Sequence, residues 1–322
     1  MADFVVAVDG GNSKTDVVVA STSGRVLART RGPGVVSPLG DPAGWREALS
    51  ALVTEATRAA RVRGSAACAA YFLANVDLPA EFRIARRELA RAGLAEVTVV
   101  RNDTLAVLRA GASRDWGVAV VSGAGINAVG VHPSGRTAGF LALGDYTGDS
   151  GGGIGLGIAA LGAAVRSRDG RGPATALARS VPAAFGLRRP AEVAIAVHTG
   201  AVPYDGLHAL APVLFAAAAD GDAVATTLVD GFADEVAVMA TALIRRLRLT
   251  RSDVEVVLGG GTLQTGNGVL HDRVAAGVAA VAPRARVCVL DAPPVFGAVA
   301  EAWVAIGGPP AALRRIRRAL TG

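Results

Sequence analysis

The residue types best suited to chemistry gather first in a polar turn near the N-terminus. Asp9 ends a short apolar run, and the residues that follow it are Gly10, Gly11, Asn12, Ser13, Lys14 and Thr15. Consecutive glycines let backbone N–H groups approach an anion closely, and Lys14 is the only lysine in the chain. An ordinary hairpin turn has a similar composition. We favour a phosphate-binding turn, in which the carboxylate of Asp9 holds Mg²⁺ through water.

A second glycine-rich turn lies between two apolar runs in the middle of the chain. It contains Ser122, Gly123 and Gly125, and the spacing of its glycines and Ala128 matches a dinucleotide-binding fingerprint. That fingerprint requires a helix after the glycines, because the pyrophosphate binds at the helix N-terminus. Residues 128–131 are instead typical of a strand. We therefore expect a second hairpin at the position that mirrors the first, with both hairpins facing one phosphate chain.

Two further candidate sites follow predicted strands. Gly259, Gly260 and Gly261 come after an apolar run and leave an open surface against which a flat ring can lie, although such turns are common. Asp103 stands where the predicted strand 97–100 gives way to a helix. It suits a helix N-cap. It also suits a general base that accepts the proton of an attacking hydroxyl, because open α/β folds place their sites at the carboxyl edge of the sheet.

Hydrophobic periodicity divides the chain into two halves with the same order of elements. Each half begins with three strands and then alternates helix and strand, which indicates two related α/β domains. We expect a first domain in residues 1–113 and a second in residues 114–307, with a helical insertion over about 155–247. A C-terminal helix over about 308–322 can pack back on the first domain. The predicted strands are 5–8, 17–20, 26–30, 69–73, 97–100, 118–121, 128–131, 137–141, 254–258 and 287–290, and the predicted helices outside the insertion are 45–63, 79–92, 104–110, 293–306 and 310–320.

Composition restricts the class of protein. The chain has 322 residues, 51% of them hydrophobic, and can form two substantial cores. Its net charge of +6 comes from arginines scattered among acidic residues, and aromatic residues make up only 4%, so we expect no nucleic-acid partner. Two cysteines exclude a disulfide scaffold and a cysteine-ligated zinc site. Apolar stretches fall short of the ~20 residues of a membrane span, and the acidic start is unlike a signal peptide, so we expect a cytoplasmic protein without a membrane partner.

Taken in order, these motifs resemble those of the N-acetylglucosamine kinase and BadF-type ATPase family. The first turn, Asn102-Asp103, the second turn with Asn127, Gly148-Asp149 and the late glycines follow one another as in that family, from residue 5 to about residue 305. The family belongs to the superfamily of actin, sugar kinases and heat-shock chaperone ATPases. The resemblance therefore implies two ribonuclease-H-like domains with ATP in the cleft between them. It also implies ATP- and Mg²⁺-dependent phosphorylation of a hexosamine such as N-acetylglucosamine or glucosamine at the 6-hydroxyl.

The resemblance implies a role for each matching residue. Asp9 matches the aspartate that organises Mg²⁺, and Asp103 matches the base that deprotonates the sugar hydroxyl. The first and second turns match the two phosphate loops, and the late glycines match the adenosine site. The other residues that match the sugar site are Asp77, Asn102, Asn127 and Asp149.

Four positions depart from the family pattern. Ala124 stands where the family usually has Thr, Asn75 where it has Gly, and Ser150 where it has Glu or Trp. The stretch 32–37 lacks the Asn that the family offers to the sugar. Loss of a buried hydrogen-bond partner changes substrate discrimination by orders of magnitude, so the identity of the sugar is open. Also open are a non-catalytic sugar or nucleotide sensor, a homodimer and, with less support because the two cysteines form no cluster motif, a dehydratase-activating ATPase.

Overall fold

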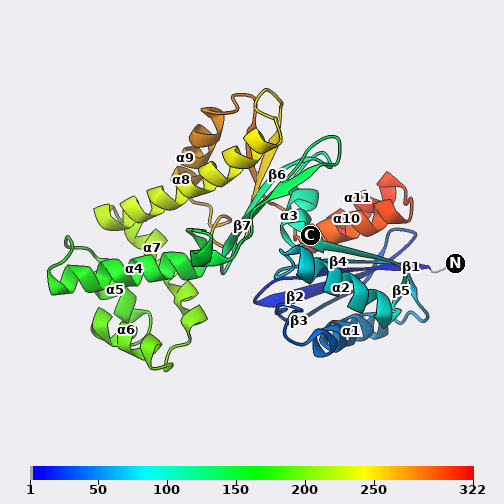
Figure 1. Ribbon diagram of the computed structural model, residues 1–322, viewed down its shortest axis with the longest axis horizontal. Helices are drawn as coiled ribbons and strands as arrows, with labels where there is room; N and C mark the ends of the chain where they lie inside the picture. The colour runs from blue at the N-terminus through cyan, green and yellow to red at the C-terminus, as the bar shows by residue number, and fades with distance from the viewer. Residues whose placement is uncertain (1–2) are drawn as a thin grey trace. The chain divides into compact units, whose positions relative to one another are not determined.

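The computed structural model describes residues 3–322, which form two compact units, each built around one five-stranded sheet (Figure 1). The first unit contains the chain up to Ala119 together with Val131–Arg136 and Cys288–Gly322. The second contains Val120–Gly130 and Thr137–Val287. The domain boundaries expected near residues 113 and 307 stay predictions. The main difference is in residues 288–307, which were expected in the second domain and lie in the first unit.

The first sheet has its strands in the order β3-β2-β1-β4-β5. β1 pairs antiparallel with β2 and parallel with β4, which in turn is parallel to β5. The turn after β1 and the loops after β4 and β5 therefore emerge at the same edge of the sheet. Nearly all of β1, β2 and β4 is buried on both faces, which explains why these strands read as continuous apolar runs. The bounds are β1 Phe4–Gly10, β2 Lys14–Ser21, β3 Val26–Pro33, β4 Ala66–Leu73 and β5 Ala95–Asn102.

Helices cover both faces of this sheet (Figure 1). On one face α1 contacts β2 and β3, α2 contacts β5, and the two helices pack against each other. On the other face α10 packs on β1 and β4 and against α3, while α11 contacts β3 and α10. Gly297 of α10 lies so close to Ala106 of α3 that a Cβ atom at Gly297 would overlap the Ala106 carbonyl. The bounds are α1 Pro42–Ala59, α2 Pro79–Ala92, α3 Thr104–Gly111, α10 Val295–Ala305 and α11 Pro310–Thr321.

The second sheet repeats the strand order of the first. Its order is β10-β9-β6-β7-β8, so that β6 to β10 occupy the places that β1 to β5 hold in the first sheet. The duplicated architecture predicted from the sequence is thereby confirmed. The bounds are β6 Gly117–Ser122, β7 Ile126–Val131, β8 Thr137–Gly139, β9 Glu255–Gly259 and β10 Arg286–Val289.

The helical insertion predicted over about 155–247 is present, with more breaks than expected. Gly200 and Gly221 adopt positive φ angles and end two helices that the sequence reads as continuous. One helix, α9, lies between β9 and β10, packs on α8 and was not predicted. Within residues 3–322, no helix combines the length and apolarity needed to cross a membrane. The bounds are η1 Gly144–Tyr146, α4 Gly152–Asp169, α5 Leu177–Ala183, α6 Pro190–His198, η2 Tyr204–Ala209, α7 Leu210–Ala219, α8 Ala223–Arg246 and α9 Gly268–Ala279.

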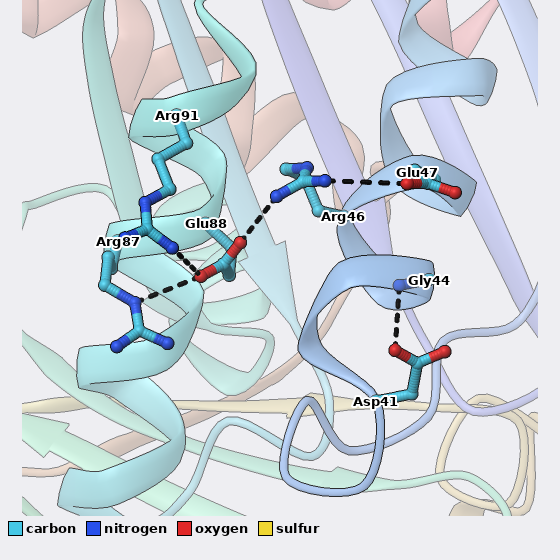
Figure 2. A network of polar contacts seen from close by, with 7 residues as sticks. All are labelled: Asp41, Gly44, Arg46, Glu47, Arg87, Glu88 and Arg91. Carbon is cyan, nitrogen blue, oxygen red and sulfur yellow. Dashed lines mark hydrogen bonds and ion pairs between the residues drawn. The ribbon is translucent and has the colours of Figure 1, made fainter.

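A buried carboxylate joins α2 to α1 in the first unit (Figure 2). The side chain of Glu88 is only 3% exposed, and it accepts hydrogen bonds from Arg46 of α1 at 2.8 Å, Arg87 at 3.0 Å and Arg91 at 2.9 Å. Burial acts to raise the pKa of Glu88, but the three guanidinium groups outweigh it and hold the pKa below its ordinary value. The cluster fixes the position of α2, which follows directly on the loop after β4.

We expect Glu88→Gln to destabilise the first unit at neutral pH, because the substitution removes the charge that three arginines share. A carboxyl whose pKa is lowered by folding stabilises the fold above its ordinary pKa of 4.5, and that contribution is lost as the pH falls through the folded-state value. The melting temperature of the variant should therefore fall below that of the wild type at pH 7, and the difference should shrink as the pH is lowered below 4.5. Glu47→Gln is the matched control, because Glu47 is 73% exposed and contacts Arg46 at 3.5 Å. Equal effects of the two substitutions would contradict the prediction.

Candidate active site

The turn between β1 and β2 is the hairpin that the sequence predicts. The N–H of Gly11 donates to the carbonyl of Lys14 at 2.9 Å and closes the turn. Asn12, Ser13 and Lys14 are exposed at its tip. Their backbone and side-chain donors are therefore accessible to an anion.

Gly10 and Thr15 hold this turn in place through contacts that the sequence does not reveal. The hydroxyl of Thr15 is buried and donates to the carbonyl of Pro33 at 2.6 Å. The carbonyl of Gly10 accepts from the N–H of Ala74 at 2.7 Å, and a Cβ atom at Gly10 would lie 2.8 Å from the side chain of Leu73. These bonds fix the hairpin to the ends of β3 and β4. The Thr15 hydroxyl, expected as a donor to phosphate, is thus engaged by Pro33. The assignment of both residues to a phosphate loop stays a prediction.

Lys14 lies beside a buried carboxylate that the sequence analysis did not single out. Its Nζ is 3.4 Å from Oδ2 of Asp16, and Arg31 of β3 donates to the same carboxylate from Nε at 2.9 Å and from Nη2 at 3.2 Å. Burial acts to raise the pKa of Asp16, but the Arg31 hydrogen bond and the charges of Lys14 and Arg31 lower it below its ordinary value. The Lys14 side chain remains 55% exposed. Its ammonium group is therefore anchored at Asp16 and still accessible to a second anion.

Asp103 lies between β5 and α3, where its neighbour Asn102 also contacts the first residue of the helix. The Asn102 Oδ1 accepts from the N–H of Thr104 at 3.1 Å and from the Thr104 hydroxyl. Asp103 is the N-cap residue of α3 but makes no standard side-chain capping bond among the described residues, although the N–H of Thr104 acts on its carboxyl group. The N–H of Asp103 donates to the carbonyl of Leu73 at 3.3 Å, which places the residue beside the end of β4. Asn102 thus contributes to the start of α3, a role that had been expected of Asp103 alone.

Asp9 and Asp103 share this edge of the sheet, and both have raised pKa values. Burial raises the pKa of Asp103 to about 7, and the charge of Asp77 adds to the shift, whereas the backbone N–H groups of Thr104 and Asp103 act in the opposite direction. Burial likewise raises the pKa of Asp9 to about 8, with further contributions from the charges of Asp103 and Asp16, whereas Lys14 acts in the opposite direction. Crowded, desolvated carboxylates of this kind are typical of functional sites. Asp9, Asp77 and Asp103, all three predicted site residues, thus lie in one cluster in the structure.

Asp77 is held in this cluster by its neighbours. The Asn102 Nδ2 donates to Oδ1 of Asp77 at 2.8 Å. The Glu81 Oε2 accepts from the N–H groups of Asp77 at 3.0 Å and Leu78 at 2.9 Å. Glu81 also accepts from the hydroxyl of Ser37 at 2.9 Å, which ties the loop after β3 to the loop after β4. The sequence analysis missed Glu81, although a glutamate in the first turn of a helix that begins with proline signals such a capping contact.

The β6–β7 turn of the second unit is also the predicted hairpin. The N–H of Gly123 donates to the carbonyl of Gly125 at 2.9 Å, and both glycines are exposed. Because a strand follows the glycines, the dinucleotide fingerprint is excluded here. Ser122 is buried, and its carbonyl and hydroxyl both accept from the hydroxyl of Thr262. The Ser122 side chain is thus engaged within the second unit, and its place in a phosphate loop stays a prediction.

The three late glycines differ in their surroundings. Gly259 is buried at the end of β9, whereas Gly261 is exposed. Gly260 has a φ of +89°, and a Cβ atom there would overlap the backbone of Ser122. Close approach to the β6–β7 hairpin therefore requires glycine at position 260. The assignment of all three to an adenosine site stays a prediction.

Asn127 and Asp149, the remaining predicted sugar residues, both belong to the second unit. Asn127 lies on β7 and accepts a hydrogen bond from the next residue along the chain. Asp149 accepts from the N–H of Gly144 at 3.1 Å and from the hydroxyl of Thr147. Burial and the charge of Asp149 raise the pKa of Glu235, a residue of α8 that the sequence analysis did not single out. The expectation that the groups of the two units act on one ligand stays a prediction.

A family model supplies the decisive comparison. The model of the BadF/BadG/BcrA/BcrD ATPase family matches residues 6–288 of the chain. The chain belongs to this family. A curated relative, the N-acetylmuramic acid/N-acetylglucosamine kinase of Clostridium acetobutylicum, is 24% identical over 299 residues, which cover 92% of this chain and 97% of the relative. The resemblance inferred from the motifs is thus confirmed at the level of the family.

Solved structures agree with the predicted fold class. A Chromobacterium violaceum protein, provisionally assigned as an N-acetylglucosamine kinase, matches with a TM-score of 0.72 at 22% identity, covering 92% of this chain and 98% of that one. A ROK family glucokinase from Streptomyces griseus, solved with glucose and AMPPNP, matches with a TM-score of 0.58 at 18% identity, covering 95% and 100%. At these identities the likeness shows the fold. The two-domain α/β fold of the actin-like ATPase type is confirmed, and the ATP cleft between the domains stays a prediction.

We expect Gly34→Ala to disturb the first hairpin, because a Cβ atom at Gly34 would overlap the carbonyl of Asn12. The loop after β3 and the hairpin would have to separate, at a cost of about 1–3 kcal/mol in the free energy of unfolding. Urea denaturation measures this change. Gly40→Ala is the matched control, because Gly40 lies in the same loop and a Cβ atom there meets nothing within 4 Å. Equal stability of the two variants would show that the close approach at Gly34 is not a constraint.

Proposed function

We propose that the protein is an ATP-dependent sugar kinase that phosphorylates a hexosamine, such as N-acetylglucosamine or glucosamine, at its 6-hydroxyl. The observation that carries the proposal is the carboxylate of Asp103, whose pKa is raised to about 7 in the same loop cluster as the hairpin that exposes Asn12, Ser13 and Lys14. A base beside an anion-binding turn is what phosphoryl transfer to an alcohol requires. Membership in the ATPase family and the name of the Clostridium acetobutylicum relative support it.

Asp103 acts in this proposal as the general base. A carboxyl with a pKa near 7 is about half ionised at neutral pH and can accept a proton from a sugar hydroxyl. As the bond forms between that hydroxyl oxygen and the γ-phosphorus, the bond from the γ-phosphorus to the β–γ bridging oxygen breaks. The proton passes to the Asp103 carboxylate, and ADP leaves with the electron pair of the broken bond. Because little covalent chemistry falls to the protein, positioning of the two substrates supplies most of the rate.

The sugar is held by polar side chains from both units. In the first unit Asn102 and Asp77 are joined by a hydrogen bond of 2.8 Å and lie beside Asp103. In the second unit we assign Asn127 and Asp149 to the same substrate, on the family resemblance. Asp77 and Asp149 accept hydrogen bonds from sugar hydroxyls, while the amide of Asn127 supplies a donor.

The nucleotide is held by glycine-rich turns. We assign the phosphates to the first hairpin and to Ser122, Gly123 and Gly125, and the adenosine to the glycines that follow β9. Exposed backbone N–H groups and the ammonium of Lys14 offset the charge of the phosphates.

The donor set of the first unit fits a magnesium ion held jointly by protein and nucleotide. Among residues 3–322 no group of three or more His, Cys, Asp or Glu side chains forms a complete metal site. Mg²⁺ commonly takes one carboxylate and completes its shell with phosphate oxygens and water. Asp9 would supply that carboxylate, since the negative charges of Asp103 and Asp16, which with burial raise its pKa to about 8, favour a nearby cation. When bound, the ion neutralises charge that develops on the phosphate oxygens.

The departures from the family pattern bear on which sugar is used. Ser37, in the stretch where the family offers an Asn to the sugar, donates its hydroxyl to Glu81. Ala124 lacks the hydroxyl of the usual Thr. These differences change the polar groups that face the sugar, so the assay needs several acceptors, including N-acetylmuramic acid, which the curated relative's name includes. We place the reaction in the cytoplasm, where ATP is present.

Asp103→Asn should abolish phosphorylation and leave nucleotide binding intact. We expect kcat to fall by about 10²- to 10⁴-fold, because the amide cannot accept the proton, while the Kd for Mg·ATP changes by less than about threefold. ADP release is measured with glucosamine, N-acetylglucosamine, N-acetylmuramic acid and glucose, and nucleotide binding by calorimetry.

Asp115→Asn serves as the control for this experiment, because Asp115 is an exposed aspartate outside the site. Normal turnover in Asp103→Asn would refute the assigned base. If the wild-type protein bound a sugar but released no ADP with any acceptor, the result would favour a non-catalytic sugar or nucleotide sensor over a kinase.

A further inference from the structure

Asn75 occupies an unusual backbone position directly after β4. Its φ angle is +58°, in the left-handed region that side-chain-bearing residues rarely adopt. Asparagine tolerates this region better than most residues, and glycine tolerates it best. Glycine would serve this backbone at least as well, so the backbone alone does not explain the asparagine. Its side chain must be considered.

The Asn75 side chain bridges two other loops of the first unit. Its Nδ2 donates to Oδ1 of Asn12 at 2.7 Å and to the carbonyl of Val35 at 3.0 Å. The N–H of Val35 in turn donates to the carbonyl of Gly11 at 3.0 Å. One amide group therefore joins the tip of the first hairpin, the loop after β3 and the loop after β4.

Chemistry fixes the orientation of both amides in this bridge. A backbone carbonyl can only accept, so the atom of Asn75 that faces Val35 must be its nitrogen. The atom of Asn12 that faces that nitrogen must then be an oxygen. The acceptor end of Asn12 is thus occupied, and its NH₂ group is the end left for a further partner. Phosphate oxygens accept hydrogen bonds, so this is the end of Asn12 that a phosphate requires.

We propose that Asn75 is a positioning residue for nucleotide binding, which sets the Asn12 amide so that its NH₂ group faces the phosphates. The inference rests on the proposed kinase function and assigns a role to a residue outside the predicted site. Asn75 itself does not touch the nucleotide in this account. It acts through Asn12 and through the position of the hairpin.

The second unit contains a corresponding bond. β9 holds the place of β4 in the strand order, and β6 the place of β1. In the loop after β9 Thr262 donates its hydroxyl to Ser122 at the end of β6. There, too, a residue with positive φ, Gly260 at +89°, follows the strand. Each unit therefore fastens its glycine-rich hairpin to the loop after its fourth strand by a side-chain hydrogen bond.

A double-mutant cycle on Asn12 and Asn75 tests the proposal. Asn75→Gly keeps the left-handed backbone accessible and removes only the side chain, and Asn12→Ala removes the proposed phosphate contact. We expect each single variant to raise KM for ATP by about 3- to 10-fold, with KM for the sugar unchanged. The double variant should show no more than the larger single effect, because Asn75 acts through Asn12. Asn75→Asp should be worse than Asn75→Gly, since a carboxylate cannot donate to Val35 or Asn12.

Arg61→Gly is the matched control, because Arg61 is an exposed residue that also has a positive φ of +56°. It should leave both KM values unchanged. The role of Asn75 would be overturned if the double variant raised KM for ATP by the product of the two single effects. It would also be overturned if Asn75→Gly left KM for ATP unchanged. A wild-type protein that binds no Mg·ATP in calorimetry would instead refute the proposed function itself.

Discussion

Crowding of carboxylates at one edge of the first sheet is the physical constraint on which the site depends. Burial raises the pKa of Asp9, at the end of β1, to about 8 and that of Asp103, after β5, to about 7; the charge of Asp103 adds to the first shift and the charge of Asp77 to the second. Groups whose pKa is raised by folding favour the folded state while they are protonated, and this contribution is lost as the pH rises through those values. Near neutral pH the carboxyl groups are partly ionised in the ligand-free protein, and the ionised form lowers the stability of the fold. Binding of a cation or proton transfer from a substrate offsets that cost.

The loops that present these carboxylates are fastened to one another rather than left flexible. Glu81 joins the loops after β3 and β4, and Asn75 joins both to the first hairpin. A general base and an anion-binding turn contribute to phosphoryl transfer only if their positions are fixed to within a fraction of an ångström. In the second unit the bond from Thr262 to Ser122 likewise fixes the glycine-rich hairpin to the loop after β9, with different residues.

The sequence revealed the parts of the site whose signals are local. Glycine-rich turns between apolar runs predicted both hairpins, and the matching order of elements predicted the duplicated sheets. Contacts between segments distant in the chain were not predictable in this way. The bonds from Thr15 to Pro33 and from Asn75 to Asn12 exist only because strand order brings β3 and β4 beside the first hairpin. The helix α9 and the additional breaks in the insertion were missed because short helices separated by glycine give weak periodicity.

A carboxyl ¹³C NMR titration of the ligand-free protein tests the central claim most directly. Two aspartate carboxyl resonances should titrate with midpoints near 7 and 8, far above the ordinary value of 3.8. In Asp103→Asn one of them should disappear, and the midpoint of the other should move down because the neighbouring charge is gone. Titration of every aspartate carboxyl below about pH 5 would contradict the account, since that is the range of unperturbed groups.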